Sequence, residues 1–339
     1  MTTTFWSETL AHLAAREDLS TGEAGEAMRQ MMAGEATPGQ IGAFLLAIRT
    51  KGETADELDG LSSTMLEFAT PVHPSVPVVD TCGTGGDRSG TFNISTVSAI
   101  VVAATGTPVA KHGNRAASSH CGSADVLEAL GVRIDLDAAG AERSLAQVGI
   151  AFMFAQTFHP SMRHAGPIRK ELGIPTVFNV LGPLTNPARP FAQVIGVSDE
   201  RMLPLMAEVL ARRGVRAKLF RGEDGLDELT TTGISTVLDV RDGAVREVHL
   251  DPADIGLARA THADLAGGDA AHSADIVRSI LSGEHGPRRD VVLLNAGAAL
   301  EVAGKAGGID QGITMAAEAI DSGAATALLD AWVTASRNG

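Results

Sequence analysis

Hydrophobic positions in the first 70 residues recur at the three- and four-residue spacing of amphipathic helices. The pattern predicts four short helices, whose apolar stripes are Phe5, Trp6, Leu10 and Leu13; Ala24, Ala27, Met28, Met31 and Met32; Ile41, Phe44, Leu45 and Ile48; and Leu58, Leu61, Met65 and Phe68. Three of them begin at capping pairs, which are Ser20 with Glu23, Thr37 with Gln40, and Thr54 with Glu57. We therefore expect a small helical bundle, and its methionines favour a bundle core or a subunit interface over an open binding groove.

The pattern changes after a stiff connection at Pro71, Pro74 and Pro77. Short β-branched runs then alternate with helical stretches, which predicts an α/β domain with a mostly parallel central sheet flanked by helices. Strands are predicted near 78–81, 108–111, 132–134, 149–154, 192–197 and 216–221, with a hairpin at 236–240 and 245–250. Helices are predicted near 95–105, 123–130, 137–147, 161–172, 199–213, 269–282, 291–303, 311–321 and 324–335.

A chain of 339 residues is long enough for one medium-sized domain and a small one. We predict a helical domain at 1–73 and an α/β domain at 74–339. The net charge of −14 argues against nucleic acid or an anionic membrane as the main partner. Cys82 and Cys121 form neither a disulfide framework nor a C-x-x-C motif, and no unbroken apolar stretch reaches membrane-spanning length. We therefore expect a soluble, cytoplasmic protein.

A glycine-rich loop follows the first predicted strand and contains Gly83, Gly85 and Gly86, and a helical run opens at 93–96. A strand, a glycine loop and a helix N-terminus together bring backbone N–H groups against a phosphate. A tight turn without a ligand is the common alternative. Arg88 stands where a dinucleotide loop needs glycine, and the P-loop motif does not occur. The loop therefore suggests phosphate without naming the nucleotide.

Further motifs follow this loop in order: 111–119 (KHGNRAASS), 122–131 (GSADVLEALG), 182–187 (GPLTNP) and 224–228 (DGLDE). Together with 83–87 (GTGGD), they resemble the anthranilate phosphoribosyltransferase family of tryptophan biosynthesis, over nearly the whole chain. The resemblance implies a homodimeric enzyme that transfers the phosphoribosyl group of 5-phosphoribosyl 1-pyrophosphate to the amine of anthranilate. It also implies that the segment 160–190 returns to the helical domain and places Arg169 in the cleft between the domains.

The donor carries a pyrophosphate and a 5′-phosphate, both of which need N–H donors, hydroxyls or cations. The two loops offer such groups, although a serine-rich loop is otherwise usually a solvated turn. The resemblance assigns donor binding to Gly83, Gly86, Asp87, Thr91, Asn93, Ile94, Ser95, Thr96, Lys111, His112, Gly113, Asn114, Arg115, Ala116, Ala117, Ser118, Ser119 and Ser123.

Asp227 and Glu228 are adjacent carboxylates in a glycine-containing loop. Such pairs are usually solvated, but magnesium takes one or two carboxylates and completes its shell with water and phosphate oxygens. The resemblance assigns both residues, with the hydroxyl of Ser95, to two magnesium ions. The bound diphosphate needs this neutralisation, because the protein itself is acidic.

The acceptor, anthranilate, carries a carboxylate beside a weakly basic aromatic amine. An arginine fork fits a carboxylate with two hydrogen bonds, and Arg169 matches the family residue in that role, with Gly83 and Asn114 as further contacts. The alternative is a surface arginine beside Glu171. His159 is expected to line the acceptor route.

His112 could orient substrate, accept a proton or merely stabilise a turn. No residue is predicted to act as a nucleophile. We therefore expect direct displacement at the anomeric carbon, through a transition state with oxocarbenium character.

The chain departs from the family pattern at two places. One is His120-Cys121, and the other is Arg221, a position at which histidine is frequent in the family. Two rival functions share the expected architecture. A pyrimidine nucleoside phosphorylase differs in the residues that follow Lys111, and a nucleic-acid-binding relative is opposed by the charge of −14.

Overall fold

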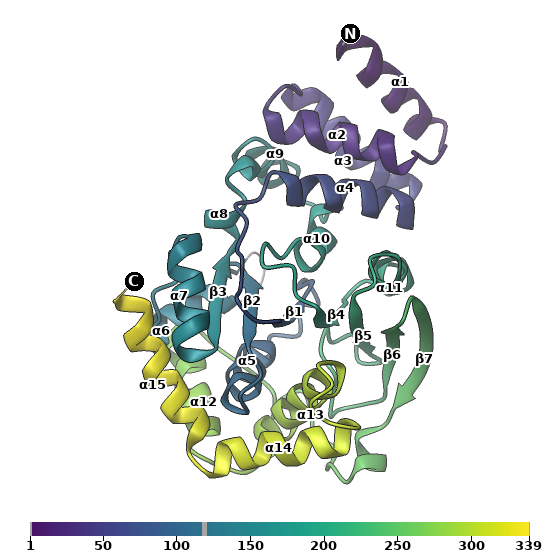
Figure 1. The fold of residues 1–339 in the computed structure, drawn as a ribbon. Helices are drawn as coiled ribbons and strands as arrows, with labels where there is room; N and C mark the ends of the chain where they lie inside the picture. The colour runs from purple at the N-terminus through teal and green to yellow at the C-terminus, as the bar shows by residue number, and fades with distance from the viewer. Residues whose placement is uncertain (1, 117–120, 339) are drawn as a thin grey trace.

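The computed structural model describes residues 2–116 and 121–338. A layer of helices lies at one end of the molecule, and a sheet with helices on its faces forms the larger body beneath it (Figure 1). The four N-terminal helices are α1 (Thr2–Ala14), α2 (Thr21–Ala33), α3 (Pro38–Lys51) and α4 (Ala55–Glu67). The capping boxes predicted for α2, α3 and α4 are all formed.

The central sheet has the strand order β3-β2-β1-β4-β5-β6-β7. Its strands are β1 (Val79–Gly83), β2 (Val109–Gly113), β3 (Ile150–Phe154), β4 (Ala192–Gly196), β5 (Arg216–Gly222), β6 (Ser235–Arg241) and β7 (Ala244–Leu250). The strands from β3 to β5 are parallel, and β6 and β7 add an antiparallel hairpin at the edge. The strand order reverses between β1 and β4, and open α/β sheets bind ligands at the carboxyl ends of the strands beside such a point.

The longer helices of the α/β body pack around the sheet, and the last four of them form the C-terminal part of the chain (Figure 1). They are α5 (Ile94–Ala104), α6 (Ser123–Leu130), α7 (Ala138–Val148), α11 (Met202–Arg212), α12 (Ala270–Leu281), α13 (Pro287–Val302), α14 (Ile309–Asp321) and α15 (Ala324–Arg337). Short helical segments are α8 (Ala155–Phe158), η1 (Pro160–Arg163), α9 (Gly166–Leu172), α10 (Phe178–Leu181), η2 (Gly182–Leu184) and η3 (Pro252–Ile255).

Two predicted elements are wrong. Residues 132–134 form no strand, because Val132 donates back to Leu127 at the end of α6 and Arg133 donates its backbone N–H to Ser336 Oγ of α15 at 3.0 Å. Helix–turn and side-chain partners therefore take the groups that a ladder would use. The helix predicted at 161–172 is divided into η1 and α9, each of which has a proline in its first turn.

One apolar cluster joins the helical bundle to the body of the molecule. It contains Met28, Phe44 and Leu58 of the bundle. It continues through α10 and α11 to buried side chains of β4 and β5. Buried Ala165, Val177, Phe178, Val180 and Leu181 belong to the same cluster, so the segment around α9 and α10 packs on the N-terminal helices. The domain boundaries at 1–73 with 160–190, and at 74–339, stay a prediction.

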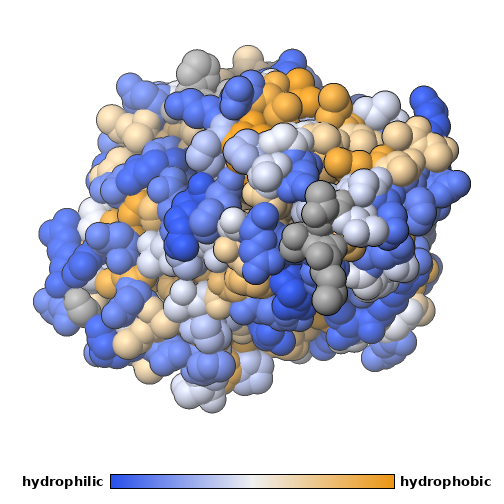
Figure 2. All heavy atoms as spheres, turned by 90° about the horizontal axis from the view of Figure 1, so that it is seen from above, coloured by the Kyte–Doolittle hydropathy of each residue, from blue (hydrophilic) through white to orange (hydrophobic). Residues whose placement is uncertain are grey.

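The surface of the helical end carries apolar patches among polar side chains (Figure 2). Leu46 of α3 and Ile174, which follows α9, stay 50% and 44% exposed in the single chain. Among the described residues, no helix is both long and apolar enough to span a membrane.

Candidate functional site

The glycine loop leaves the carboxyl end of β1 and ends at the N-terminus of α5. Gly85, Gly86 and Gly90 have φ angles of 66°, 84° and 69°, a backbone region that side chains disfavour, and Arg88 joins them at 59°. The loop is held from two sides, since Gly85 N donates to Asp227 Oδ2 at 2.7 Å and Ser198 Oγ donates to the Gly85 carbonyl at 2.7 Å. The predicted strand, loop and helix therefore form the expected anion-binding geometry.

The N-terminus of α5 is reached by an acidic side chain. Ser95 N donates to Glu228 Oε1 at 3.1 Å, while Asn93 caps nothing and donates its amide to the Cys121 carbonyl at 3.0 Å. A carboxylate is favourable at this end of a helix, and a phosphate would be favoured for the same reason.

Glu228 is buried and Asp227 is partly buried, which disagrees with the common alternative of a fully solvated surface pair. Burial raises the pKa of Asp227 well above its ordinary value, with further contributions from the nearby charges of Asp87 and Glu228. Burial also raises the pKa of Glu228 to about 8, although Lys111 opposes the shift. Three carboxyl groups therefore meet in a desolvated place, a cost that a bound cation would offset.

Lys111 lies beneath the N-terminus of α5 and is 1% exposed. Its Nζ donates to the Thr81 carbonyl and to Ser95 Oγ, the latter at 3.3 Å. Asp80 is fully buried nearby and accepts from His112 N at 3.2 Å and from Asn186 Nδ2 at 2.8 Å. The positive charge of Lys111 thus acts on the buried carboxyl groups of Asp80 and Glu228.

On the other side of β2, two histidine rings face one another. The centroids of His112 and His159 are 5.1 Å apart, and His112 Nδ1 lies 3.0 Å from the Gly182 carbonyl. Burial lowers the pKa of His112 to about 3 and that of His159 to about 4, so both rings are neutral near pH 7. A ring with so low a pKa is a weak general base, and because it stays neutral it keeps one nitrogen able to accept a hydrogen bond.

Arg169 projects from α9, with its guanidinium carbon 5.1 Å from the centroid of the Phe178 ring. Burial lowers the pKa of Arg169. Within the described part of the chain it forms no ion pair, and its side chain is partly buried, unlike the surface arginine beside Glu171 that is the alternative. A partly buried cation on an aromatic face, without a carboxylate partner, suits an aromatic acid.

Buried polar atoms without hydrogen-bond partners gather at residues that the resemblance selected. Among the described residues they include Asp87 Oδ2, Asn93 Oδ1, Thr96 Oγ1, His112 Nε2 and both ring nitrogens of His159. Buried polar groups in proteins are nearly always satisfied. Their concentration here marks a place prepared for a polar ligand.

The second loop is described in part. Gly113 must lack a side chain, because a Cβ there would lie 2.3 Å from Ser123 Oγ. Arg115 pairs with Asp125 and Glu128 of α6, and Asn114 accepts from Arg115 N at 2.8 Å, so both are engaged within the loop. Ala117, Ser118, Ser119 and the unusual His120 lie outside the described residues.

The remaining predicted residues lie in the same region. Thr91 forms an isolated bridge with Ala266, Ile94 opens α5, and Ala116 N donates to Asp125 at 3.0 Å. Cys121, the second half of the first departure, is buried. Arg221, the other departure, donates from Nε to the Ser198 carbonyl at 3.1 Å and so supports the residue that holds Gly85.

Asp80, Asn186 and Ser198 were missed as site residues. Asp80 lies in the strand predicted near 78–81 and Asn186 in the motif 182–187, but residue type alone gave them no role. Their importance depends on contacts between segments far apart in the chain, which no local pattern reveals.

Two family models cover most of the chain. The one described as glycosyl transferase family, helical bundle domain, matches residues 7–69, and the one described as glycosyl transferase family, a/b domain, matches residues 75–326. Fold and site thus define a two-domain glycosyl transferase, as the resemblance of the motifs implied.

Named relatives identify the branch of this family. Anthranilate phosphoribosyltransferase of Acidothermus cellulolyticus is 58% identical over 98% of this chain and 95% of that protein, and the Nocardioides sp. enzyme is 55% identical over 97% and 98%. The solved structure of the Thermus thermophilus enzyme has a TM-score of 0.92 at 43% identity, and covers 97% of this chain and 99% of that chain. The chain belongs to the anthranilate phosphoribosyltransferase family.

A structure of the Saccharomyces cerevisiae enzyme in complex with PRPP and Mg matches with a TM-score of 0.92 at 28% identity, and covers 99% of both chains. These similarities confirm the predicted family, fold and enzyme class, and they set aside the phosphorylase and nucleic-acid-binding alternatives. The role of each site residue stays a prediction.

Proposed function

We propose that this chain transfers the phosphoribosyl group of 5-phosphoribosyl 1-pyrophosphate (PRPP) to the amine of anthranilate, giving N-(5-phosphoribosyl)anthranilate and pyrophosphate in tryptophan biosynthesis. The observation that carries the proposal is Arg169, a partly buried cation that lies against Phe178 with no carboxylate partner in the described chain. A planar carboxylate would pair with the guanidinium fork, while Phe178 keeps its contact with the face of the same cation. The family of named relatives supplies the reaction that uses such an acceptor.

The donor's diphosphate is proposed to bind between the glycine loop and the N-terminus of α5. Gly85 and Gly86 allow the backbone to approach the phosphate oxygens, and the helix end favours their charge. Lys111 contributes positive charge from below, through its contact with Ser95 Oγ. Thr91, Asn93 and Thr96 offer polar side chains from the same segment, two of which have unsatisfied buried atoms.

Magnesium fits the acidic part of the site. Asp227 and Glu228 carry raised pKa values because they are desolvated, and Asp87 Oδ2 has no hydrogen-bond partner, so a divalent cation would relieve all three. Among the described residues no three His, Cys, Asp or Glu side chains form a closed metal cage. Asp227, Glu228 and Ser95 would therefore hold the ion together with donor oxygens, and we propose two ions. When bound, magnesium neutralises the pyrophosphate that departs.

We assign no nucleophile among the described residues of this region, and the proposed chemistry is direct transfer. The C1′–N bond forms as the C1′–O bond to pyrophosphate breaks, and the amine loses one proton to the departing pyrophosphate or to water. His112 holds its Nδ1 toward the Gly182 carbonyl, which directs Nε2 as an acceptor. With a pKa of about 3, this ring is proposed to orient the amine N–H and not to remove its proton. His159 packs against it and keeps it in place.

We further propose a homodimer formed through the helical end. Leu46 and Ile174 are large apolar side chains left exposed there in the single chain, and a second copy would cover them.

The two free, buried cysteines fit a reducing cytoplasm. The net charge of −14 continues to oppose nucleic acid as a partner.

A fluorescence assay tests the function directly. Anthranilate fluorescence should fall only when PRPP and magnesium are both present, with one pyrophosphate released for each anthranilate consumed. Reactions without PRPP, and reactions with a pyrimidine nucleoside and phosphate in its place, are the controls. Cleavage of the nucleoside without anthranilate consumption would overturn the proposal in favour of a phosphorylase.

A further inference from the structure

The turn that follows β4 connects the glycine loop with a second part of the molecule. Ser198 N donates to Thr84 Oγ1 at 3.0 Å, and Ser198 Oγ donates to the Gly85 carbonyl at 2.7 Å. Arg221 holds the Ser198 carbonyl from the opposite side at 3.1 Å. The position of Ser198 is therefore coupled to the backbone of the glycine loop by several short hydrogen bonds.

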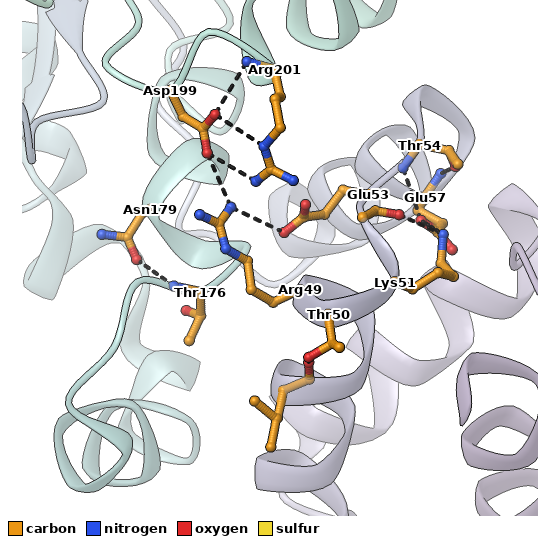
Figure 3. Close-up of polar contacts among 12 residues, drawn as sticks. Arg49, Thr50, Lys51, Glu53, Thr54, Glu57, Thr176, Asn179, Asp199 and Arg201 are labelled. Atoms are coloured by element: carbon orange, nitrogen blue, oxygen red, sulfur yellow. Dashed lines mark hydrogen bonds and ion pairs between the residues drawn. The ribbon is translucent and has the colours of Figure 1, made fainter. Parts of the chain in front are cut away.

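The next residue, Asp199, reaches the helical domain. Its Oδ2 accepts from Arg49 Nη1 of α3 at 3.1 Å, and it also accepts from the Arg201 side chain at 3.0 and 3.3 Å (Figure 3). Arg49 and Asp199 are 30% and 28% exposed, so their contact is partly shielded from water. A continuous path thus runs from α3 through Arg49, Asp199 and Ser198 to Gly85.

Glu53 keeps Arg49 at this place. Its side chain is completely buried, and neither carboxylate oxygen has a hydrogen-bond partner among the described residues. Arg49 lies beside it, with Nη1 3.8 Å from Glu53 Oε1, and Arg201 adds a second positive charge nearby (Figure 3). An unpaired buried carboxylate is costly, so the positive charge of Arg49 stabilises the carboxylate of Glu53. The same guanidinium also pairs with the carboxylate of Asp199.

We propose that Arg49 and Asp199 are a positioning pair, which fixes the helical domain against the glycine loop and so sets how the donor is held. Neither residue touches a substrate; they act through Ser198 on Gly85. The inference rests on the proposed function, because it takes the glycine loop as the donor site. Its distinctive consequence is that a contact of α3, a helix of the other domain, controls PRPP and leaves anthranilate largely unaffected.

The test uses Arg49→Met, Asp199→Asn and the double variant in the full-length protein. Asparagine keeps an oxygen for Arg201 N, which donates to Asp199 Oδ1 at 3.1 Å. Each single change is expected to raise the KM for PRPP about fivefold, as loss of a partly shielded ion pair would. The KM for anthranilate should change by less than about twofold. The double variant should match Arg49→Met in its KM for PRPP, since the Arg49–Asp199 contact is already lost in that single variant.

The pair between Arg212 and Asp56 provides the matched control. It joins the same two parts of the molecule at 2.5 Å, at the opposite end of α11, and it has no contact with Ser198. Arg212→Met should leave both KM values unchanged. Arg49→Lys, which keeps the charge without the fork, should restore part of the PRPP affinity.

Calorimetric titration of PRPP with magnesium, without anthranilate, separates this inference from the proposed function. Weaker PRPP binding by Arg49→Met than by wild type supports the positioning pair, even if no transfer is detected. Equal PRPP binding by the two proteins would overturn it, as would equal effects on both substrates or an effect of the same size in Arg212→Met. Failure of wild type to transfer the phosphoribosyl group would count against the function alone.

Discussion

Gly196 lies so close to Asp227 that a Cβ on it would stand 1.5 Å from the Asp227 carbonyl oxygen. Its partner in the β1–β4 ladder is Gly83, where a Cβ would stand 2.5 Å from Asp227 Oδ2. Two glycines at the same level of neighbouring strands therefore make room for the acidic loop. Asp227 can sit beside the glycine loop because neither strand end carries a side chain.

Alanine at these two positions should have different effects. Gly196→Ala forces backbone apart and is expected to destabilise the fold by about 3 kcal/mol or more. Gly83→Ala meets a side chain, so it should displace the Asp227 carboxylate, raise the magnesium requirement and cost less stability. Urea unfolding and magnesium titration of activity measure the two effects. Gly39→Ala is the control, since a Cβ there meets nothing within 4 Å; equal stability losses at 83 and 196 would contradict this account.

Neutral substitution of the acidic pair should separate activity from stability. Desolvation raises the pKa of both carboxyl groups, so the ionised form of each one opposes folding. Asp227→Asn and Glu228→Gln are therefore expected to lower turnover and raise the magnesium requirement, while thermal midpoints stay equal or increase. Thermal melts and magnesium titrations check this. Unchanged magnesium dependence in both variants would remove these residues from the metal site.

Arg169 should control the acceptor and not the donor. Arg169→Ala loses a charge-assisted, two-point contact of about 1.5–3 kcal/mol, which corresponds to roughly ten- to hundredfold weaker handling of anthranilate. The KM for PRPP should remain nearly unchanged, and Arg169→Lys should rescue poorly because it lacks the planar fork. Steady-state kinetics with each substrate varied in turn measure this. Lys170→Ala, at an exposed neighbour on α9, is the control. Equal impairment of both substrates would assign Arg169 to structure or to the donor.

The buried histidines should make the protein acid-sensitive. The pKa values of His112 and His159 in the folded state, about 3 and 4, lie below the ordinary value of 6.5. The unfolded chain therefore binds more protons between pH 6.5 and 4, and stability falls as pH falls through this window. His159→Gln should remove about 1–2 kcal/mol of the loss between pH 7 and 5. Urea unfolding at both pH values measures it. An unchanged pH slope would show that His159 is accessible to protons in the fold.

Local patterns determined much of this molecule. Capping pairs and apolar spacing placed the N-terminal helices, because a short helix depends on its own ends and on one buried face. The strand–glycine–helix order placed the phosphate loop for the same local reason. Residues 132–134 misled because β-branched residues also suit a buried turn, and the ladder partner that decides between the two is not local.

The tertiary structure decided which charges are left unpaired. Arg169 and Glu171 are close in the sequence, yet only packing shows that the arginine rests on Phe178 without an acid, and that Arg115 has two acids. The sequence by itself determined the family and the resemblance of each loop to the loops of that family. Both depend only on the types of the residues and on their order. The pKa values of Glu228 and His112, and the path from Arg49 to Gly85, depend on desolvation and on contacts between distant segments. Burial and distance are properties of the folded chain. They decide which of the matched residues lie together and which charges and protonation states those residues have.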